Sequence, residues 1–503
     1  MKKQCYLSFE TRNGNKYLFD SNTGTVLPVN DLLAEAIELY ESLSIEQVHE
    51  ILLSKYPQNN VDGALDFINR WFTLYGGFYR MVEDGAYVNE RARSFKTTDI
   101  QEYLQAGFMF QMVLNLTEDC NLRCRYCYLS ENYNFTRNRT NKLMTVETGK
   151  KALDYFFGQL KPLAKRNPGK SAAVTFYGGE PFLNFVTMKQ LVEYCKKYSP
   201  VPIYFNLTTN GTVFSDEIFD FLVSNHIYVV ISLDGTKENH DRNRVFANGQ
   251  GTFNIVFNNI KRFKERYPNY DQIGLVCVYD FLTDLEANEQ FFEEHNLPPI
   301  IFVNGVFNLN TDYYQRFSVE DEVRFYQQKD RLLKKYFENK IQGKLTSTFL
   351  KTLFELSAIP VIYRPRFLDS NPTMIPFTGT CVPGMKISVR TDGTFDICER
   401  VNSTMPIGKL ETGLNFEAIK EIIYHYNESI TKGCWGCSIS RNCPLCYAQC
   451  MKDAEFNYPN ITCKQMVESF QKNFSLVYSI LEVQPDAFKG LEDPLMQTIL
   501  FKY

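Results

Sequence analysis

The chain has few histidines and tryptophans, no excess of positive charge and no long apolar run. Its 503 residues include 5 His and 2 Trp, and the formal net charge is −4. Without a basic surface, binding to nucleic acid is not expected. No segment approaches the ~18 consecutive apolar residues of a membrane span, so we expect no membrane insertion. Lys2 and Lys3 are not followed by the apolar segment of a secretory signal, and we therefore expect a cytoplasmic protein.

Cysteine, by contrast, is plentiful, with 14 residues. Disulfides are rare in a reducing cytoplasm, so the spacing of these cysteines points to metal instead. One trio lies at 120–127, and eight more follow residue 380. Three cysteines stand alone and are expected to be buried or incidental: Cys5, Cys195 and Cys277. Cys195 and Cys277 fall in helix and strand patterns, where cysteine behaves as a small apolar residue.

From residue 108 to residue 306 the sequence alternates predicted strands and helices. The predicted strands are Phe108–Leu116, Ala172–Tyr177, Pro202–Leu207, Ile227–Leu233, Gln272–Tyr279 and Pro299–Val303. The helical patterns that separate them lie near 146–160, 186–199, 215–225, 253–266 and 284–296. Six strands with crossover helices predict a parallel sheet, either a partial barrel or an open sheet, with ligands at the carboxyl ends of the strands.

The flanking regions do not follow this pattern. The N-terminal region reads as a small winged-helix-like α+β module, in which Ser21–Gly24 forms a hairpin turn. The cysteine-rich region has little apolar periodicity, and we expect it to be mostly loop and to need metal in order to fold. The expected domains are the module at 1–100, an α/β core at 105–310, a helical bridge at 311–375, the cysteine-rich domain at 376–465, and a C-terminal helix and tail at 466–503.

The first cysteine trio follows the first core strand directly. Cys120, Cys124 and Cys127 have a spacing that lets three thiolates reach three corners of one iron–sulfur cube. Such clusters usually take four cysteines, and a missing ligand leaves one iron open for a substrate or cofactor. The alternative is a structural zinc site, which would need a fourth ligand, but no further His or Cys lies nearby in the sequence.

This CxxxCxxC motif, with Tyr126 before its last cysteine, resembles that of the radical SAM superfamily. The resemblance implies a partial (β/α)6 barrel, similar to part of a TIM barrel, whose catalytic [4Fe–4S] cluster is held by the three cysteines. It also implies that the open iron chelates the amino and carboxylate groups of S-adenosylmethionine. One-electron reduction then cleaves this cofactor to a 5′-deoxyadenosyl radical, which abstracts hydrogen from the substrate.

Further motifs at strand ends follow the order found in the same family. Gly178, Gly179 and Glu180 match the turn that accepts hydrogen bonds from the cofactor's amino group. The other matching positions are Thr209, Asn210, Ser232 and Asp234 for the ribose, Arg244 for the cofactor carboxylate, and Tyr126 beside the adenine.

The eight later cysteines suffice for two four-ligand sites, which by spacing alone could be zinc sites. They are Cys381, Cys398, Cys434, Cys437, Cys443, Cys446, Cys450 and Cys463. Behind a CxxxCxxC core, the run resembles the SPASM extension of radical SAM enzymes that modify peptides. The resemblance implies two auxiliary [4Fe–4S] clusters, and thus three clusters in all. Their role is structural, or they transfer electrons or bind a substrate thiolate.

The SPASM pattern also implies which cysteines share a cluster. The second auxiliary cluster takes Cys434, Cys437, Cys443 and Cys463. The first takes Cys381, Cys398 and either Cys450 or Cys446. This chain departs from the pattern because Cys446 is interposed, and our hypothesis is that both Cys446 and Cys450 ligate the first auxiliary cluster.

The N-terminal module resembles the leader-recognition domain of enzymes that mature ribosomally made peptides. That domain binds the leader of a precursor peptide by adding it as a strand to a sheet edge. The alternative is a docking subdomain without peptide contact. Together, the three parts resemble maturases that join a substrate Cys sulfur to carbon in a thioether, of the sactipeptide or ranthipeptide type. Such an enzyme needs an external one-electron donor such as flavodoxin or ferredoxin.

Two other activities and one non-enzymatic role stay open. Related enzymes form carbon–carbon links in peptides, or oxidise a sulfatase Cys or Ser to formylglycine. Sulfatase maturases place an Asp base after the cysteine that corresponds to Cys398, where this chain has Glu399. Glu399 is a candidate catalytic base, and a surface or ion-paired glutamate is the alternative. An iron–sulfur electron carrier or adaptor would explain the cysteines but not the ordered strand-end motifs.

Overall fold

The computed structural model describes most of the chain. The described residues are 2–81, 95–130, 132–133, 138–167, 169–308, 311–364, 380–401, 403–434, 436–452, 454–457 and 460–491. Each of the expected domains therefore lies partly outside the described residues.

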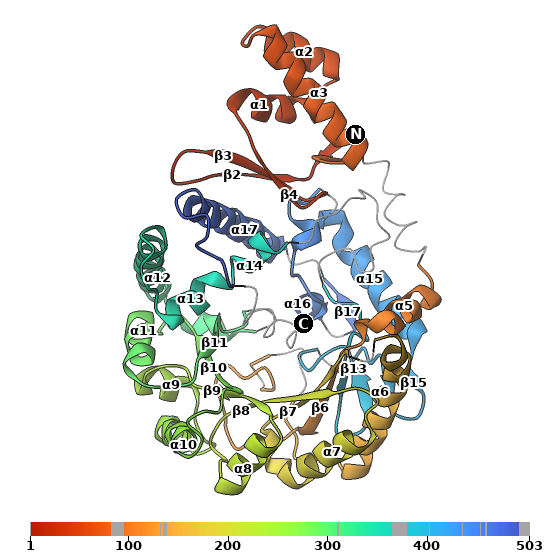
Figure 1. Cartoon of the computed structure of the whole chain (residues 1–503), viewed down its shortest axis with the longest axis vertical. Coiled ribbons are helices and arrows are strands. Elements are labelled where there is room, and N and C mark those ends of the chain that lie inside the picture. Colours follow the sequence, from red (N-terminus) through yellow and green to blue (C-terminus); the bar gives the residue numbers. More distant parts are fainter. Residues whose placement is uncertain are drawn as a thin grey trace.

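Six parallel strands form the centre of the fold (Figure 1). They are β6 (Gln111–Thr117), β7 (Ala172–Gly178), β8 (Ile203–Thr209), β9 (Tyr228–Ser232), β10 (Ile273–Tyr279) and β11 (Ile300–Gly305). They lie side by side in chain order, and every neighbouring pair is parallel. All seven residues of β6 are buried, as expected for a strand that is covered on both faces.

Crossover helices surround these strands (Figure 1). They are α6 (Val146–Arg166), α7 (Phe185–Tyr198), α8 (Asp216–Ser224), the short α9 (Lys237–Asn243), α10 (Phe253–Arg266) and α11 (Leu285–Glu294). Thr145, Ser215 and Asp284 are the N-caps of α6, α8 and α11, because their side chains accept hydrogen bonds from first-turn backbone amides. The predicted α/β fold is confirmed, and the six predicted strands lie within a few residues of their expected bounds.

The sheet continues beyond the six strands into the cysteine-rich region. β12 (Lys386–Val389) pairs with β6 in parallel, and three short antiparallel strands bring the sheet to ten. They are β13 (Thr394–Asp396), β14 (Gly408–Lys409) and β15 (Gly413–Leu414). At the junction, the Asn115 side chain on β6 donates to the Ser388 hydroxyl and to the Val389 carbonyl, both at 2.9 Å. The region that carries the later cysteines thus begins as an extension of the barrel sheet.

The mostly loop structure expected for residues 376–465 is wrong over one long segment. α15 (Phe416–Cys434) has 19 residues, and its buried apolar side chains include Ile419, Ile423, Tyr426 and Ile430. Their spacing of three or four residues is the helical period, so a core-facing stripe is present in the sequence. The other elements of this region are α16 (Tyr447–Cys450), β16 (Met451–Lys452) and β17 (Glu455–Phe456).

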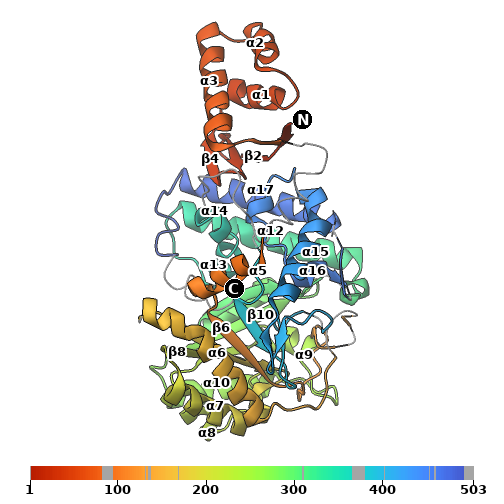
Figure 2. The same cartoon turned by 90° about the vertical axis from the view of Figure 1, so that its right-hand side faces the viewer.

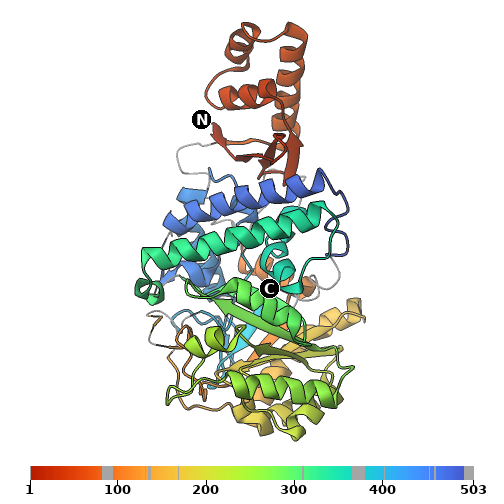
Figure 3. The same ribbon diagram turned by 90° about the vertical axis from the view of Figure 1, so that its left-hand side faces the viewer.

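A layer of helices lies between the barrel and the N-terminal module (Figures 1 and 2). Its long members, α12 (Val319–Ile341) and α17 (Asn460–Leu481), run side by side, as Figure 3 shows. The shorter α13 (Thr348–Glu355) and α14 (Ile359–Ile362) complete the layer, and α5 (Thr97–Tyr103) leads toward β6. Among the helices that the structure describes, none has the length and apolar content needed to cross a bilayer.

The N-terminal module has a hydrophobic core of its own. Its elements are the antiparallel sheet of β2 (Tyr6–Glu10), β3 (Lys16–Asp20) and β4 (Thr25–Pro28), the pair β1 (Lys2–Gln4) and β5 (Tyr79–Met81), and the helices α1 (Asp31–Tyr40), α2 (Ile45–Leu53) and α3 (Gln58–Tyr75). Leu18 packs in this core, whereas Phe9 and Phe19 belong to the main core and pack against Phe474 of α17. One face of the small sheet therefore packs against the rest of the molecule.

Candidate active site

The first cysteine trio lies in the loop that follows β6. Cys120, Cys124 and Cys127 come together there, because each thiol is affected electrostatically by another of the three. Burial is the largest influence on these thiols, and it raises the pKa of Cys120 and of Cys124 to about 11. Such thiols keep their protons until a metal displaces them.

Two amide groups donate to the sulfur of Cys120. They are the backbone N–H of Leu122 at 3.4 Å and the side-chain amide of Asn210 at 3.7 Å. Within the described residues, no three His, Cys, Asp or Glu side chains surround a single metal-ion position. In an iron–sulfur cube each cysteine binds a different iron, so the three sulfurs do not converge on one point.

Glu180, just after β7, is fully buried and connects the carboxyl ends of two strands. Its carboxylate accepts hydrogen bonds from Thr209 Oγ1 (2.8 Å), from Asn210 N (2.8 Å) and from Phe182 N (3.2 Å). Burial raises the pKa of Glu180 to about 7. A carboxylate has about four acceptor positions, so the three internal donors leave capacity for one donor from a ligand.

The two glycines before Glu180 are required by the backbone itself. Gly178 has φ +130°, and a Cβ there would lie 2.1 Å from Thr117 O. A Cβ at Gly179 would lie 1.9 Å from Asp119 O. The turn passes this close to the chain that leads into Cys120, so only glycine fits at either position.

Tyr126, Asp234 and Arg244 form a second connected group. The Tyr126 hydroxyl donates to Asp234 Oδ2 (2.5 Å) and accepts from Arg244 Nη1 (2.9 Å). The other oxygen of Asp234 accepts from the backbone of Val278 on β10 (3.0 Å). Arg244 is 6% exposed, and its Nε has no hydrogen-bond partner among the described residues. A buried guanidinium with an unused donor is suited to bind a carboxylate.

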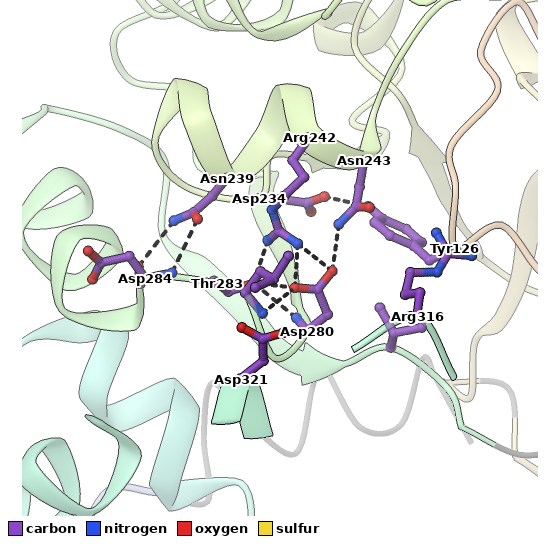
Figure 4. A network of polar contacts seen from close by, with 12 residues as sticks. Tyr126, Asp234, Asn239, Arg242, Asn243, Asp280, Thr283, Asp284, Arg316 and Asp321 are labelled. Carbon is purple, nitrogen blue, oxygen red and sulfur yellow. Dashed lines mark hydrogen bonds and ion pairs between the residues drawn. The ribbon is translucent and has the colours of Figure 1, made fainter. Parts of the chain in front are cut away.

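Ser232, at the end of β9, is also buried. The strand-end residues singled out in the sequence thus lie at or just beyond the carboxyl ends of β6 to β9. Sequence reasoning missed a further carboxylate, Asp280, directly after β10. Figure 4 shows it close to Tyr126 and Asp234, with Arg242 and Asn243 around it. Its place just after a predicted strand was a signal that could have identified it.

A set of polar side chains connects the first trio with Cys398. The Tyr128 hydroxyl donates to the Tyr177 hydroxyl (2.9 Å), and both tyrosines are close enough to Cys127 and Glu399 for their charges to act on them. Sequence reasoning missed both tyrosines, although Tyr128 follows Cys127 directly.

Glu399, the candidate base, is ion-paired. Its Oε2 lies 2.9 Å from Lys386 Nζ, and each of the two side chains is 14% exposed. Burial by itself would raise the pKa of Glu399, but the charges of Lys386 and Arg400 outweigh burial and lower it to about 2. The Arg400 side chain is near Glu399, Tyr177, Tyr128 and Cys398, and its backbone N–H donates to the Cys398 thiol. Lys386 carried no signal in the sequence, because only the pairing of β12 with β13 brings it near Glu399, which lies just beyond β13.

The eight later cysteines fall into two groups that adjoin each other. In the first, Cys381 is close to Cys446, and Cys398 is close to Cys381. The second surrounds Cys434, whose neighbours are Cys437, Cys443, Cys463 and Cys450. Cys446 adjoins both groups, because it is close to Cys381 and also to Cys443. Cys450 is close to Cys446, and its other neighbours are Cys463 and Cys443 of the second group.

Comparison with known proteins identifies the core. Residues 114–284 match the model of the Radical SAM superfamily, and the match begins in β6 and spans the cysteine trio and every strand-end motif described above. The protein is an enzyme with a radical SAM core.

Two relatives of this radical SAM enzyme and one solved structure extend the comparison. A cysteine-type anaerobic sulfatase-maturating enzyme from Clostridium novyi (strain NT) is 26% identical over 390 residues, which are 71% of this chain and 93% of the relative. The radical SAM cyclopropyl synthase TigE of Paramaledivibacter caminithermalis is 23% identical, over 63% of this chain and 65% of TigE. The structure of native anSMEcpe with bound AdoMet and Cp18Cys peptide covers 74% of this chain and 99% of its own, at 18% identity and a TM-score of 0.53, and this likeness concerns the fold alone.

The residues of the radical SAM core fit the cofactors that the family implies, a [4Fe–4S] cluster and S-adenosylmethionine. Three half-buried thiols in one loop, two of which have a pKa raised to about 11, suit an iron–sulfur cluster rather than a free nucleophile. Glu180 has capacity for an ammonium, and the free Nε of Arg244 suits a carboxylate. These are the two charged groups of an amino acid, which S-adenosylmethionine carries.

Proposed function

We propose that this radical SAM enzyme modifies a ribosomally made precursor peptide by joining a Cys sulfur to a carbon atom in a thioether. The observation that carries the peptide substrate is the 26% identity over 93% of a sulfatase-maturating enzyme, whose name describes action on a protein side chain. The thioether is the finer part of the proposal. It rests on the eight later cysteines, of which Cys398 lies near the polar side chains of Tyr128 and Tyr177 that connect it with the first cysteine trio.

Each part of the candidate site has a defined task in this proposal. The cysteine trio holds the cluster, while Glu180 and Arg244 orient the amino acid end of S-adenosylmethionine. Together these cofactors supply a radical that removes a hydrogen atom from carbon. Tyr126 and Asp234 fix the Arg244 side chain, because all three are connected by hydrogen bonds.

The bond changes in the peptide balance as a two-electron oxidation. A C–H bond and an S–H bond break, and an S–C bond forms. One hydrogen atom leaves to the radical, one proton leaves from the thiol, and one electron leaves the peptide. Auxiliary clusters beside the substrate are suited to accept that electron, and flavodoxin or ferredoxin is the proposed external donor for the first cluster.

Glu399 is better suited to an electrostatic role than to accepting the proton. With Lys386 beside it, its pKa of about 2 makes it a weak base. The net charge of Glu399, Lys386 and Arg400 together is positive, which favours a substrate thiolate over a thiol. Deprotonation of the substrate Cys is therefore assisted by this cationic surrounding.

We infer that the eight later cysteines hold two auxiliary clusters, and that Cys446 and Cys450 both serve the first. Cys446 lies beside Cys381, which supports its assignment, and Cys450 is close to Cys446. Iron content of the Cys446→Ala and Cys450→Ala variants after anaerobic reconstitution tests the assignment. A variant that keeps its full iron content would remove that cysteine from the ligand set.

The N-terminal module has one sheet edge suited to receive the leader of the peptide. The outer edge of β2 is occupied, because Gln471 Nε2 and Ser475 Oγ of α17 donate to its outward carbonyls at Ser8 (2.8 Å) and Glu10 (2.6 Å). A second strand cannot add where side chains already take the acceptors.

The outer edge of β4 differs from that of β2, because its outward backbone groups are not occupied by side chains of the described residues. Val29 N donates to Lys16 O (3.0 Å), so alternate residues of β4 face β3, and Val26 and Pro28 face outward. Among the hydrogen bonds of the described residues, none reaches the outward groups of Val26 or Pro28. A leader strand would thus find the amide and carbonyl of Val26 and the carbonyl of Pro28.

The decisive experiment uses the reconstituted enzyme, S-adenosylmethionine, dithionite and the precursor peptide encoded beside the gene. A thioether product has lost two hydrogens and one thiol that an alkylating reagent can modify. The Cys124→Ala variant serves as the control without cluster chemistry. A wild-type enzyme that forms 5′-deoxyadenosine but leaves every peptide thiol alkylatable would contradict thioether formation.

The leader edge has its own test. Val26→Pro removes the outward amide of β4 and is expected to abolish leader binding in a fluorescence anisotropy titration with a labelled leader peptide. Ser8→Pro removes the same kind of outward amide from the edge that α17 covers, and it is expected to bind like the wild type. Equal loss in both variants, or in neither, would rule out the β4 edge.

Formylglycine formation is the second candidate, and the relationship to sulfatase-maturating enzymes favours it. It replaces the side chain of a Cys with an aldehyde. A product that reacts with a hydrazide reagent would identify this activity, because a thioether does not react.

A further inference from the structure

One short segment supports both the cysteine loop and the arginine of the cofactor site. Arg123 N donates to Val245 O (2.7 Å), and Arg125 N donates to Asn243 O (3.0 Å). Cys124 lies between these two hydrogen bonds in the cysteine loop, and Arg244 lies between them in the segment of residues 243–245. The position of residues 243–245 therefore determines where a cluster iron and a cofactor carboxylate stand relative to each other.

Asp280 holds this segment from below, as Figure 4 shows. Its Oδ2 accepts from Asn243 Nδ2 (2.9 Å), and both of its oxygens accept from Arg242 Nη1 (2.5 and 2.6 Å). The hydroxyl of Tyr313 lies 2.7 Å from Asp280 Oδ2 and 3.0 Å from Asn243 Oδ1. Asp280 thus connects the end of β10, the end of α9 and the chain that follows β11.

Burial makes these contacts costly to replace. Asp280 is 1% exposed, Asn243 is 5% exposed, and Tyr313 is fully buried. Burial would raise the pKa of Asp280, but the Arg242 guanidinium and the hydrogen bonds outweigh it and lower the pKa. Without the carboxylate, the buried side chains of Asn243 and Tyr313 and the partly exposed Arg242 would lose their shared acceptor, and water cannot easily replace it at the buried positions.

We propose that Asp280 is a positioning residue for the radical SAM site, which acts through Asn243 on the register between the cysteine loop and Arg244. The side chain of Asn243 bonds Asp280 while its backbone carbonyl bonds the cysteine loop. A shift at Asp280 is therefore transmitted over one residue to Cys124 and Arg244. The inference concerns cofactor binding and is independent of which peptide the enzyme modifies.

The test compares three variants with the reconstituted wild-type enzyme. Asp280→Asn replaces an acceptor oxygen by a donor, which conflicts with the donors around it. Asn243→Ala keeps the pair of Asp280 and Arg242 but removes the proposed route to the loop. Glu355→Gln is the matched control, because Glu355 is a buried partner of Lys340 and Tyr336 in the helical layer, away from the site.

Two measurements are made on each variant after iron content and thermal unfolding have been checked. One is the dissociation constant for S-adenosylmethionine. The other is the change that this cofactor causes in the EPR spectrum of the dithionite-reduced cluster. We expect Asp280→Asn and Asn243→Ala each to weaken cofactor binding about tenfold and to diminish the spectral change, and Glu355→Gln to match the wild type in both.

Three results would overturn the proposal. Wild-type binding and spectral change in Asp280→Asn would show that the site does not depend on Asp280. Loss in Asp280→Asn together with wild-type behaviour in Asn243→Ala would exclude the route through Asn243. A comparable loss in Glu355→Gln would likewise count against the proposal, because it would attribute the effect to general destabilisation.

Discussion

At the scale of single residues, the ion-pair partner of Glu399 determines whether this carboxylate can act as a base. Glu399 directly follows Cys398, and a carboxylate is of a type that can act as a base. Lys386, 13 residues earlier, pairs with it across β12 and β13 and lowers its pKa to about 2. A sequence pattern names Glu399 but not this partner.

Glu399→Gln should destabilise the fold without adding a new pH dependence. It leaves Lys386 without its anion, and we expect the free energy of unfolding to fall by roughly 2–4 kcal/mol. Because the folded pKa of Glu399 is depressed to about 2, the stabilisation is present above its ordinary pKa and is lost only as the pH falls toward about 2. The midpoint of thermal unfolding at pH 7 measures the effect.

Two comparisons make this test specific. Glu417→Gln removes an exposed partner of Lys420 and should change the midpoint little. The double variant Lys386→Met with Glu399→Leu should recover most of the loss, since it leaves no unpaired charge. A pH–rate profile of the wild type with an ionisation of Glu399 between pH 5 and 9 would contradict the ion-paired assignment.

Asn210→Ala tests a contact to a cluster sulfur. The side-chain amide of Asn210 lies 3.7 Å from Cys120 Sγ, and hydrogen bonds to cluster sulfurs raise the reduction potential. We expect the potential of the first cluster to fall by on the order of tens of millivolts in an EPR-monitored redox titration. Asn225→Ala, at the end of α8, is the control, and an unchanged potential in Asn210→Ala would show that the contact has no electronic effect.

At the scale of elements, the barrel strands were predictable and their extension was not. A buried strand carries its signal in consecutive apolar residues, and β6 to β11 each have enough of them. β12 to β15 have only two to four residues each, too few for a period to emerge. Their pairing depends on β6, which lies more than 270 residues earlier in the chain.

Asn115→Leu should loosen the junction of β6 with β12. It removes two hydrogen bonds at 2.9 Å and leaves the Ser388 hydroxyl and the Val389 carbonyl buried without this donor. A cost of about 1–3 kcal/mol is expected, with faster hydrogen exchange over residues 386–396 measured by mass spectrometry. Asn259→Leu also removes a buried amide that donates to a backbone carbonyl, but in α10, and should leave exchange over 386–396 unchanged.

At the scale of the whole molecule, the N-terminal module contacts the cysteine-rich region directly. Arg441 Nη1 donates to Asn22 O (2.7 Å), and both residues are buried. Arg441 lies between Cys437 and Cys443, and Asn22 lies in the turn between β3 and β4. The hairpin that is proposed to receive the leader is thus in contact with the loop of the proposed second auxiliary cluster.

Arg441→Ala should weaken the docking of this hairpin while leaving the rest of the module folded. The module has its own core, so its helices do not depend on the contact. We expect faster hydrogen exchange over residues 16–28 and no change in α1 to α3. Arg70→Ala, which removes an exposed ion pair on α3, is the control, and wild-type exchange over 16–28 in Arg441→Ala would show that the module is held by its apolar contacts alone.

The sequence by itself determined the α/β core, the cysteine trio and the order of the strand-end motifs. These features depend on spacing along the chain, because parallel strands bring their carboxyl ends to one edge whatever their exact packing. Contacts across the sheet and between distant segments were decided only by the tertiary structure. Asp280 with Asn243, Lys386 with Glu399, and Arg441 with Asn22 depend on strand register and helix docking, which no local pattern encodes.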